Sequence, residues 1–124
     1  MADASAQTAA EVPVSDFARA LAAGRFVITA ELVPPVSTDP ADVVARASPL
    51  KGLVTAVNVT DGAGARAHLS SLVAARILLE AGIEPILQMT CRDRNRIALE
   101  SDLLGALALG IHNVLVLSGD DPKA

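Results

Sequence analysis

The stretch Phe26–Pro35, FVITAELVPP, places a glutamate near the end of an apolar run that two prolines follow. An unpaired charge at the tip of a buried strand is costly, so we expect Glu31 to have either a partner or a chemical role. One interpretation is a structural ion pair with Arg66 or Arg92. The other is proton transfer, because a carboxyl group shielded by strand tips can keep its proton toward neutral pH, as a general acid must.

Polar residues also follow three further runs rich in Val, Ile and Leu, which read LVTAVNV, EPILQM and NVLVL. These polar residues are Asn58 and Thr60, then Gln88 and Thr90, then Ser118, Gly119 and Asp120. In parallel α/β folds the carboxyl ends of the strands meet at one rim, where ligands bind. The sequence therefore predicts one site built from all four strand ends.

Two loops after these runs carry motifs. Gly62–Ala67, GAGARA, formally matches the dinucleotide fingerprint, but the next strand ends in Gln88 and Met89 rather than an acidic residue. A flexible turn whose amides contact an anion is the alternative. The second motif, CRDRNR, has three arginines and is either a solvated helix start or a binder of phosphate or carboxylate.

The remaining candidate groups are interpreted structurally. We expect Cys91 to be a buried small residue and His112 to lie on the stability face, while His68 borders the DGAGAR loop and stays open between a structural and a functional role. Gly119–Pro122, GDDP, is interpreted as a turn rather than a metal site, because no clear ligand set accompanies it.

The elements that must position these residues follow a regular order. Strands buried on both faces are predicted to begin near residues 26, 53, 84 and 113, and helices to begin after Ser15, Asp39, Ser70 or Ser71, and Asn95. Apolar stripes include Leu99, Leu103, Leu104 and Leu107 in the last helix. Residues 1–13 are expected to be a disordered tail. The spacing indicates consecutive βα units with a parallel sheet, either a small open sheet or the first half of a barrel of about 250 residues.

The composition excludes several classes of function. The chain has 124 residues, 52% of them hydrophobic and 19% charged, and a net charge of −4, so neither nucleic-acid nor membrane partners are supported. No apolar run reaches the ~20 residues of a membrane span, and the start of the chain does not read as a secretory signal. One cysteine is typical of a reducing compartment, and we expect a cytoplasmic protein.

Taken together, ITAELVPP, VNVTDGAGAR, PILQMTCRDRNR and SDLLGALALGIHNVLVLSGDDP resemble the N-terminal half of the methylenetetrahydrofolate reductase family. The resemblance covers about Arg25 to Pro122. It implies the first four βα repeats of a flavin-dependent (β/α)₈ TIM barrel, residues 14–124, cut after strand four. It further implies the reduction of methylenetetrahydrofolate to methyltetrahydrofolate for methionine and one-carbon metabolism.

The resemblance also implies roles for single residues. Glu31 matches the general acid that opens the folate ring, and Asp120 matches the aspartate beside the flavin and the pterin. Thr60 matches a flavin contact, and Gly119 would let the backbone approach the flavin ring. Gln88 and Ser118 stand where many members have histidine and arginine.

Those departures, with Asp61 in place of a frequent tyrosine, leave several properties open. FAD is the expected cofactor, with FMN as the alternative, and no metal is expected. The electron donor is NAD(P)H or another reductant, and the complete protein is expected to form a homo-oligomer.

Two alternatives come from other classes of protein. One is a small doubly wound dinucleotide-binding module that uses the DGAGARA loop, and the other is a non-catalytic half-barrel that serves only as an assembly partner. On the barrel interpretation, the isolated chain exposes the apolar edges of strands one and four. We then expect it to aggregate, pair with another copy or fold only in part.

Overall fold

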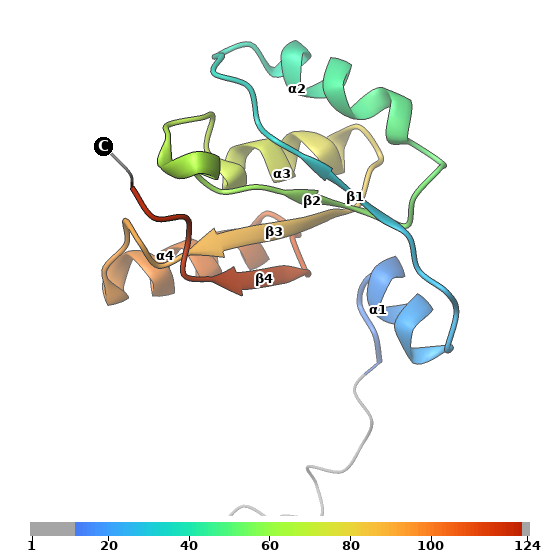
Figure 1. The fold of residues 1–124 in the computed structure, drawn as a ribbon. Helices are drawn as coiled ribbons and strands as arrows, with labels where there is room; N and C mark the ends of the chain where they lie inside the picture. The colour runs from blue at the N-terminus through green and yellow to red at the C-terminus, as the bar shows by residue number, and fades with distance from the viewer. Residues whose placement is uncertain (1–11, 123–124) are drawn as a thin grey trace, which may run out of the picture.

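The chain folds into a parallel sheet whose strands alternate with helices (Figure 1). The computed structural model describes residues 12–122. The predicted tail over residues 1–13 lies outside this range except for its last two residues. The strands are β1 (Thr29–Leu32), β2 (Ala56–Val59), β3 (Pro85–Thr90) and β4 (Val114–Leu117). The helices are α1 (Asp16–Ala22), α2 (Pro40–Ala47), α3 (Ser71–Glu80) and α4 (Arg96–Ala108).

Side chains at the predicted positions cap three of the four helices. The Ser15 hydroxyl accepts a hydrogen bond from the Ala18 amide at 3.0 Å. Asp39 caps α2 in the same way, and Asn95 caps α4. These oxygens satisfy backbone amides that have no partner inside the helix. The helix starts predicted from the sequence are therefore confirmed.

The strands lie in the order β1-β2-β3-β4, and every neighbouring pair is parallel. Helices α2, α3 and α4 lie along one side of this sheet (Figure 1). A doubly wound sheet instead reverses its strand order and has helices on both faces. The doubly wound module is therefore wrong, and the arrangement is compatible with half of a (β/α)₈ barrel.

The core lies between the sheet and these three helices. Val57 and Val59 of β2 and Leu87 of β3 are at most 1% exposed and pack in one cluster with α2, α3 and α4, through Val43, Leu78 and Ala106. Alternate residues of a strand point to opposite faces. The opposite face of the sheet, which we call the inner face, therefore carries the predicted polar residues Glu31, Asn58, Thr60 and Gln88.

Two expectations about burial are wrong. All six residues of β3 are buried, but β1 buries only Leu32, and in β4 Val116 is 76% exposed. The edge strands have a neighbour on one side only, so the burial on both faces predicted for all four strands holds for the central strands β2 and β3, with Asn58 half-buried, and fails for β1 and β4. The leucine stripe of α4 is covered only at Leu99, which packs against the core, whereas Leu104 is 74% and Leu107 63% exposed, because the small Ala106 faces the core there.

Helix α1 lies at the amino-terminal ends of the strands, away from the other helices (Figure 1). The Glu84 carboxylate, just before β3, accepts hydrogen bonds from the Asp16 and Phe17 amides at 2.8 and 2.7 Å. The Ser15 hydroxyl donates to Asn113 at 2.7 Å, just before β4. These contacts hold α1 against the amino-terminal end of the sheet. Of the helices in residues 12–122, none is both long and apolar enough to span a membrane.

Candidate functional site

A pocket of about 180 Å³ opens at the carboxyl ends of the strands, and we call it the rim pocket. It brings together five of the six residues predicted for the site, which are Glu31, Thr60, Gln88, Gly119 and Asp120. The sixth, Ser118, does not line it, and its side chain is exposed. All four strands therefore contribute to one cavity, as their polar ends predict.

Glu31 lines the rim pocket with no partner for its side chain among the described residues. Its side chain is exposed, and it makes no hydrogen bond or ion pair with any residue of the described chain. The predicted ion pair with Arg66 or Arg92 is therefore wrong. The predicted shielding is also absent here, because β1 has no neighbour on its outer edge. What remains is an acid with no structural partner at the mouth of the pocket.

Thr60 carries an unsatisfied hydroxyl. The residue is 6% exposed, and its Oγ1 is the buried side-chain polar atom within residues 12–122 that has no hydrogen-bond partner. Burying a hydroxyl without a partner costs about 1–3 kcal/mol in proteins. Because Thr60 lines the rim pocket, a polar ligand there can supply the missing partner.

Gln88 lies in a row of amides on the inner face. Its Nε2 donates to the Asn58 oxygen at 3.5 Å, and the Asn58 Nδ2 donates to the Thr29 hydroxyl at 3.3 Å. Asn58, expected at the rim, is paired in register with Glu31 but lines the cavity below the rim pocket instead. The row leaves the side-chain Oε1 of Gln88 as the acceptor available to the rim pocket.

Asp61 is a site residue that sequence reasoning did not find. Its carboxylate forms an ion pair with Arg94 and accepts hydrogen bonds from the Thr90 amide at 2.9 Å and the Thr90 hydroxyl at 3.0 Å. Burial raises the pKa of Asp61, but the hydrogen bonds from Arg94 and Thr90 outweigh it and hold the pKa below its usual 3.8. The hydrogen bond to Asp61 in turn raises the pKa of Arg94. This pair is therefore ionised and ties the end of β2 to the end of β3.

Asp120 connects the end of β4 to the loop after β2. Its Oδ2 accepts a hydrogen bond from the Gly64 amide at 2.7 Å, and its carbonyl oxygen accepts one from Arg92 at 3.0 Å. Gly119 has φ +96°, and a Cβ there would lie 3.0 Å from the Arg92 Nη1. The positive φ and the closeness of Arg92 therefore favour glycine at this position, independently of any ligand.

The dinucleotide fingerprint has little support in this geometry. The loop forms a tight 3₁₀ turn over Ala63–Ala65, and α3 begins only at Ser71. A fingerprint loop leads directly into the helix whose N-terminus meets the pyrophosphate. Here the Gly64 amide is already bonded to the Asp120 carboxylate, so it is not free for a phosphate.

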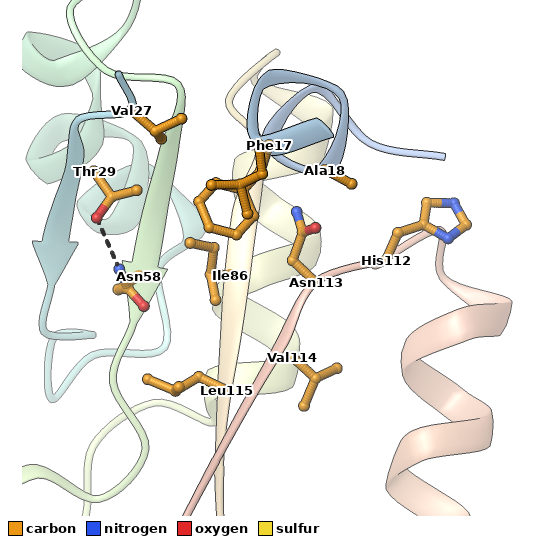
Figure 2. A pocket seen from close by; sticks show the side chains of 11 residues that line it. Phe17, Ala18, Val27, Thr29, Asn58, Ile86, His112, Asn113, Val114 and Leu115 are labelled. Carbon is orange, nitrogen blue, oxygen red and sulfur yellow. Dashed lines mark hydrogen bonds between the residues drawn. The ribbon is translucent and has the colours of Figure 1, made fainter. Parts of the chain in front are cut away.

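The larger cavity, of about 660 Å³, lies on the inner face toward the amino ends of the strands, under α1 (Figure 2). Phe17, Ile86 and Leu115 line it, with His112 at its border. Apart from Asn58, it contains none of the residues predicted to act on or bind a ligand. His112 is exposed and lies just before β4, at the amino ends of the strands as expected.

The remaining polar candidates have structural positions. Both ring nitrogens of His68 lie near carbonyl oxygens, those of Pro34 at 3.0 Å and Ala63 at 3.1 Å, so the ring joins two loops. Cys91 is exposed rather than buried as predicted. Within the described part of the chain, no three His, Cys, Asp or Glu residues group in a way that holds a metal ion.

Comparison with known proteins gives one clear relationship. The family model for methylenetetrahydrofolate reductase matches residues 16–124, which is most of the chain and includes every residue of the rim pocket. A search of the curated proteins gives no match.

Proposed function

The chain belongs to the methylenetetrahydrofolate reductase family, and from this premise we propose that it supplies the first four βα units of a (β/α)₈ barrel that reduces methylenetetrahydrofolate to methyltetrahydrofolate with a flavin. The sequential parallel sheet with helices on one side agrees with such a barrel. The uncovered residues of β1 and β4 lie where further strands of a barrel would pack.

The observation that carries this proposal is the composition of the rim pocket. It combines an unpaired acid, Glu31, with an unpartnered buried hydroxyl, Thr60, and the acceptor oxygens of Gln88 and Asp120. The orphaned Thr60 hydroxyl fits a flavin, whose ring and ribityl chain carry both donors and acceptors. Active sites of parallel barrels are built at this end of the strands.

In the proposed reaction Glu31 is the proton donor. Its proton goes to a ring nitrogen of the folate, the carbon–nitrogen bond of the five-membered ring breaks, and the methylene carbon becomes a reactive iminium carbon. When bound, the reduced flavin supplies the hydride that converts this carbon to a methyl group. Glu31 suits this role because no residue of the described chain competes for its carboxyl group.

Asp120 and Gln88 orient the substrates in this proposal. One carboxylate oxygen of Asp120 is bonded to Gly64, which leaves the other for the amino and N–H groups of a pterin. FAD is the proposed cofactor, with FMN as the alternative, and NAD(P)H or another reductant is the donor. The complete protein is proposed to be a cytoplasmic homo-oligomer.

The test uses the natural protein at its native length. We expect the purified protein to show flavin absorbance near the visible maximum of a bound flavin and to form methyltetrahydrofolate when given methylenetetrahydrofolate and a reductant. Retention of flavin without this product would contradict the folate assignment. A protein with neither flavin nor product would instead support the non-catalytic assembly partner.

A further inference from the structure

The CRDRNR motif remains without a role in the proposed reaction, although two of its three arginines are largely buried. The side chains of Arg92 and Arg94 are 14% and 19% exposed, whereas that of Arg96 is 86% exposed. A guanidinium group has five donors and no acceptor, so a buried one needs acceptors from the protein or from a ligand. The partners of each arginine decide between those two sources.

Arg94 is bonded to three elements of the chain. Its Nε donates to Asp102 of α4 at 3.0 Å, and its Nη1 donates to the Thr90 carbonyl oxygen at 2.9 Å. The same side chain forms the ion pair with Asp61, which directly follows Thr60. The end of β2, the end of β3 and α4 are therefore joined around one guanidinium group.

Arg92 joins the other side of the rim pocket. Its Nη1 donates to the Asp120 carbonyl oxygen at 3.0 Å, and its Nη2 donates to the Gly62 carbonyl oxygen at 3.3 Å. The Asp120 carboxylate accepts from the Gly64 amide in the same loop. The loop after β2 and the segment after β4 are thus held together through Arg92.

The donors of both arginines are directed to protein acceptors, which disfavours the phosphate or carboxylate binding considered for this motif. Arg96 makes only a 3.8 Å ion pair with Glu100 on the surface. Thr60 and Asp120, in contrast, lie just after β2 and β4 end at residues 59 and 117. The Thr60 amide still donates to the Leu32 carbonyl oxygen of β1 at 3.1 Å, so its backbone is held on the β1 side, and the Asp61–Arg94 pair adds the connection toward β3 and α4. Asp120 lies three residues beyond the end of β4 and depends on its contacts with Gly64 and Arg92.

We infer that Arg92 and Arg94 are positioning residues of the rim pocket: Arg94, through Asp61, fixes the Thr60 hydroxyl, and Arg92 fixes Asp120. The planar fork of arginine gives several bonds of fixed direction, which a flexible ammonium group cannot reproduce. The inference rests on the proposed function, because the ligand that these residues serve is the flavin with its folate substrate.

The experiment compares Arg94→Gln, Arg94→Lys and Arg92→Gln in the natural protein, with Arg96→Gln as the matched control from the same motif. Three quantities are measured: the Kd for FAD by fluorescence titration, the visible circular dichroism of the bound flavin at saturation, and hydrogen exchange of the Gly64 and Thr90 amides without flavin. The dichroism reports the orientation of the bound flavin, which a loss of stability alone does not change at saturation.

We expect Arg94→Gln and Arg92→Gln to weaken FAD binding about tenfold, which corresponds to roughly one hydrogen bond to the ligand, and to change the dichroism. Arg94→Lys should recover part of the affinity, because it keeps the charge opposite Asp61. Exchange should quicken at Thr90 in Arg94→Gln and at Gly64 in Arg92→Gln. Arg96→Gln should match the unsubstituted protein in all three measurements.

Unchanged Kd and dichroism in the Arg92 and Arg94 variants would overturn the inference and leave the proposed function standing. If the unsubstituted protein binds neither FAD nor FMN, the proposed function fails. Exchange then decides the inference, and unchanged protection of Gly64 and Thr90 overturns it. Should Arg94→Gln fail to fold, the same measurements on Arg94→Lys and Arg92→Gln decide the inference.

Discussion

Replacing Thr60 by valine removes one oxygen atom from the rim pocket while nearly preserving the shape of the side chain. The Thr60 hydroxyl is buried and has no partner within residues 12–122. In the ligand-free protein it therefore costs desolvation energy without forming a bond. In the proposed complex the same hydroxyl forms a hydrogen bond with the flavin. The substitution should change stability and affinity in opposite directions.

The magnitudes follow from these two states. An unpartnered buried hydroxyl costs about 1–3 kcal/mol, so Thr60→Val should raise the free energy of unfolding of the ligand-free protein by about 1 kcal/mol. A hydrogen bond to a neutral ligand group contributes about 0.5–1.5 kcal/mol, so FAD binding should weaken about two- to tenfold. Urea unfolding of the flavin-free natural protein measures the first effect, and a fluorescence titration measures the second.

Thr90→Val is the matched control for this prediction. Thr90 is 2% exposed, but its hydroxyl donates to the ionised Asp61 carboxylate at 3.0 Å. Loss of a hydrogen bond to a charged group costs about 1.5–3 kcal/mol, so this control should be destabilised. If Thr60→Val is destabilised to a similar extent, its hydroxyl has a partner and the reasoning about the rim pocket is refuted.

Three further predictions test the loops and the uncovered surface. The pKa of Asp61 is lowered on folding from 3.8, so its contribution to stability is present above pH 3.8 and lost as the pH falls through the lower folded value. Acid unfolding curves should show this loss for the unsubstituted protein and not for Asp61→Asn. Gly62 has φ +61° and a Cβ there would lie 2.6 Å from the Arg92 Nη2, whereas Gly52 has φ +79° and open space. Gly62→Ala should therefore destabilise the protein by about 1 kcal/mol more than Gly52→Ala, and equal effects in urea unfolding would show that Arg92 is free to move. Val116 is 76% exposed on β4, so the 124-residue chain should self-associate and Val116→Lys should reduce this association in analytical ultracentrifugation. A monomer with a sharp two-state transition before substitution would contradict that expectation.

Much of the fold follows from local sequence signals. Ser15, Asp39 and Asn95 are caps that act within three residues of themselves, so the helix starts were predictable. The common location of Glu31, Thr60, Gln88 and Asp120 was also predictable, since parallel strands of similar length bring their ends to one rim. Ser118 was misplaced because Leu115 and Leu117 point to the inner face, so the next residue points to the opposite face.

The contacts that depend on distant residues were not predictable. Asp61 and Arg94 are 33 positions apart and pair only because β2 and β3 are neighbours. No local pattern distinguishes Arg94, which is buried, from Arg96, which is solvated.

The exposure of the edge strands also could not be predicted from the sequence. VLVL of β4 reads as a strand buried on both faces, but burial requires neighbours on both sides. Similarly, Leu104 and Leu107 of α4 are exposed, although Leu99 of the same stripe packs against the core. Such apolar sequences indicate surfaces that pack in the complete fold, and they do not indicate what covers them.

The most direct test of the central claim separates the two half-reactions in the natural protein carrying Glu31→Gln. Glu80→Gln is the control, because Glu80 is exposed and pairs only with Arg76 on the surface of α3. In rapid-mixing experiments we expect Glu31→Gln to accept electrons from its donor at the normal rate but to lose oxidation by methylenetetrahydrofolate, while the control keeps both. Equal loss of both half-reactions, or retention of folate reduction, would contradict the assignment of Glu31 as the acid that acts on folate.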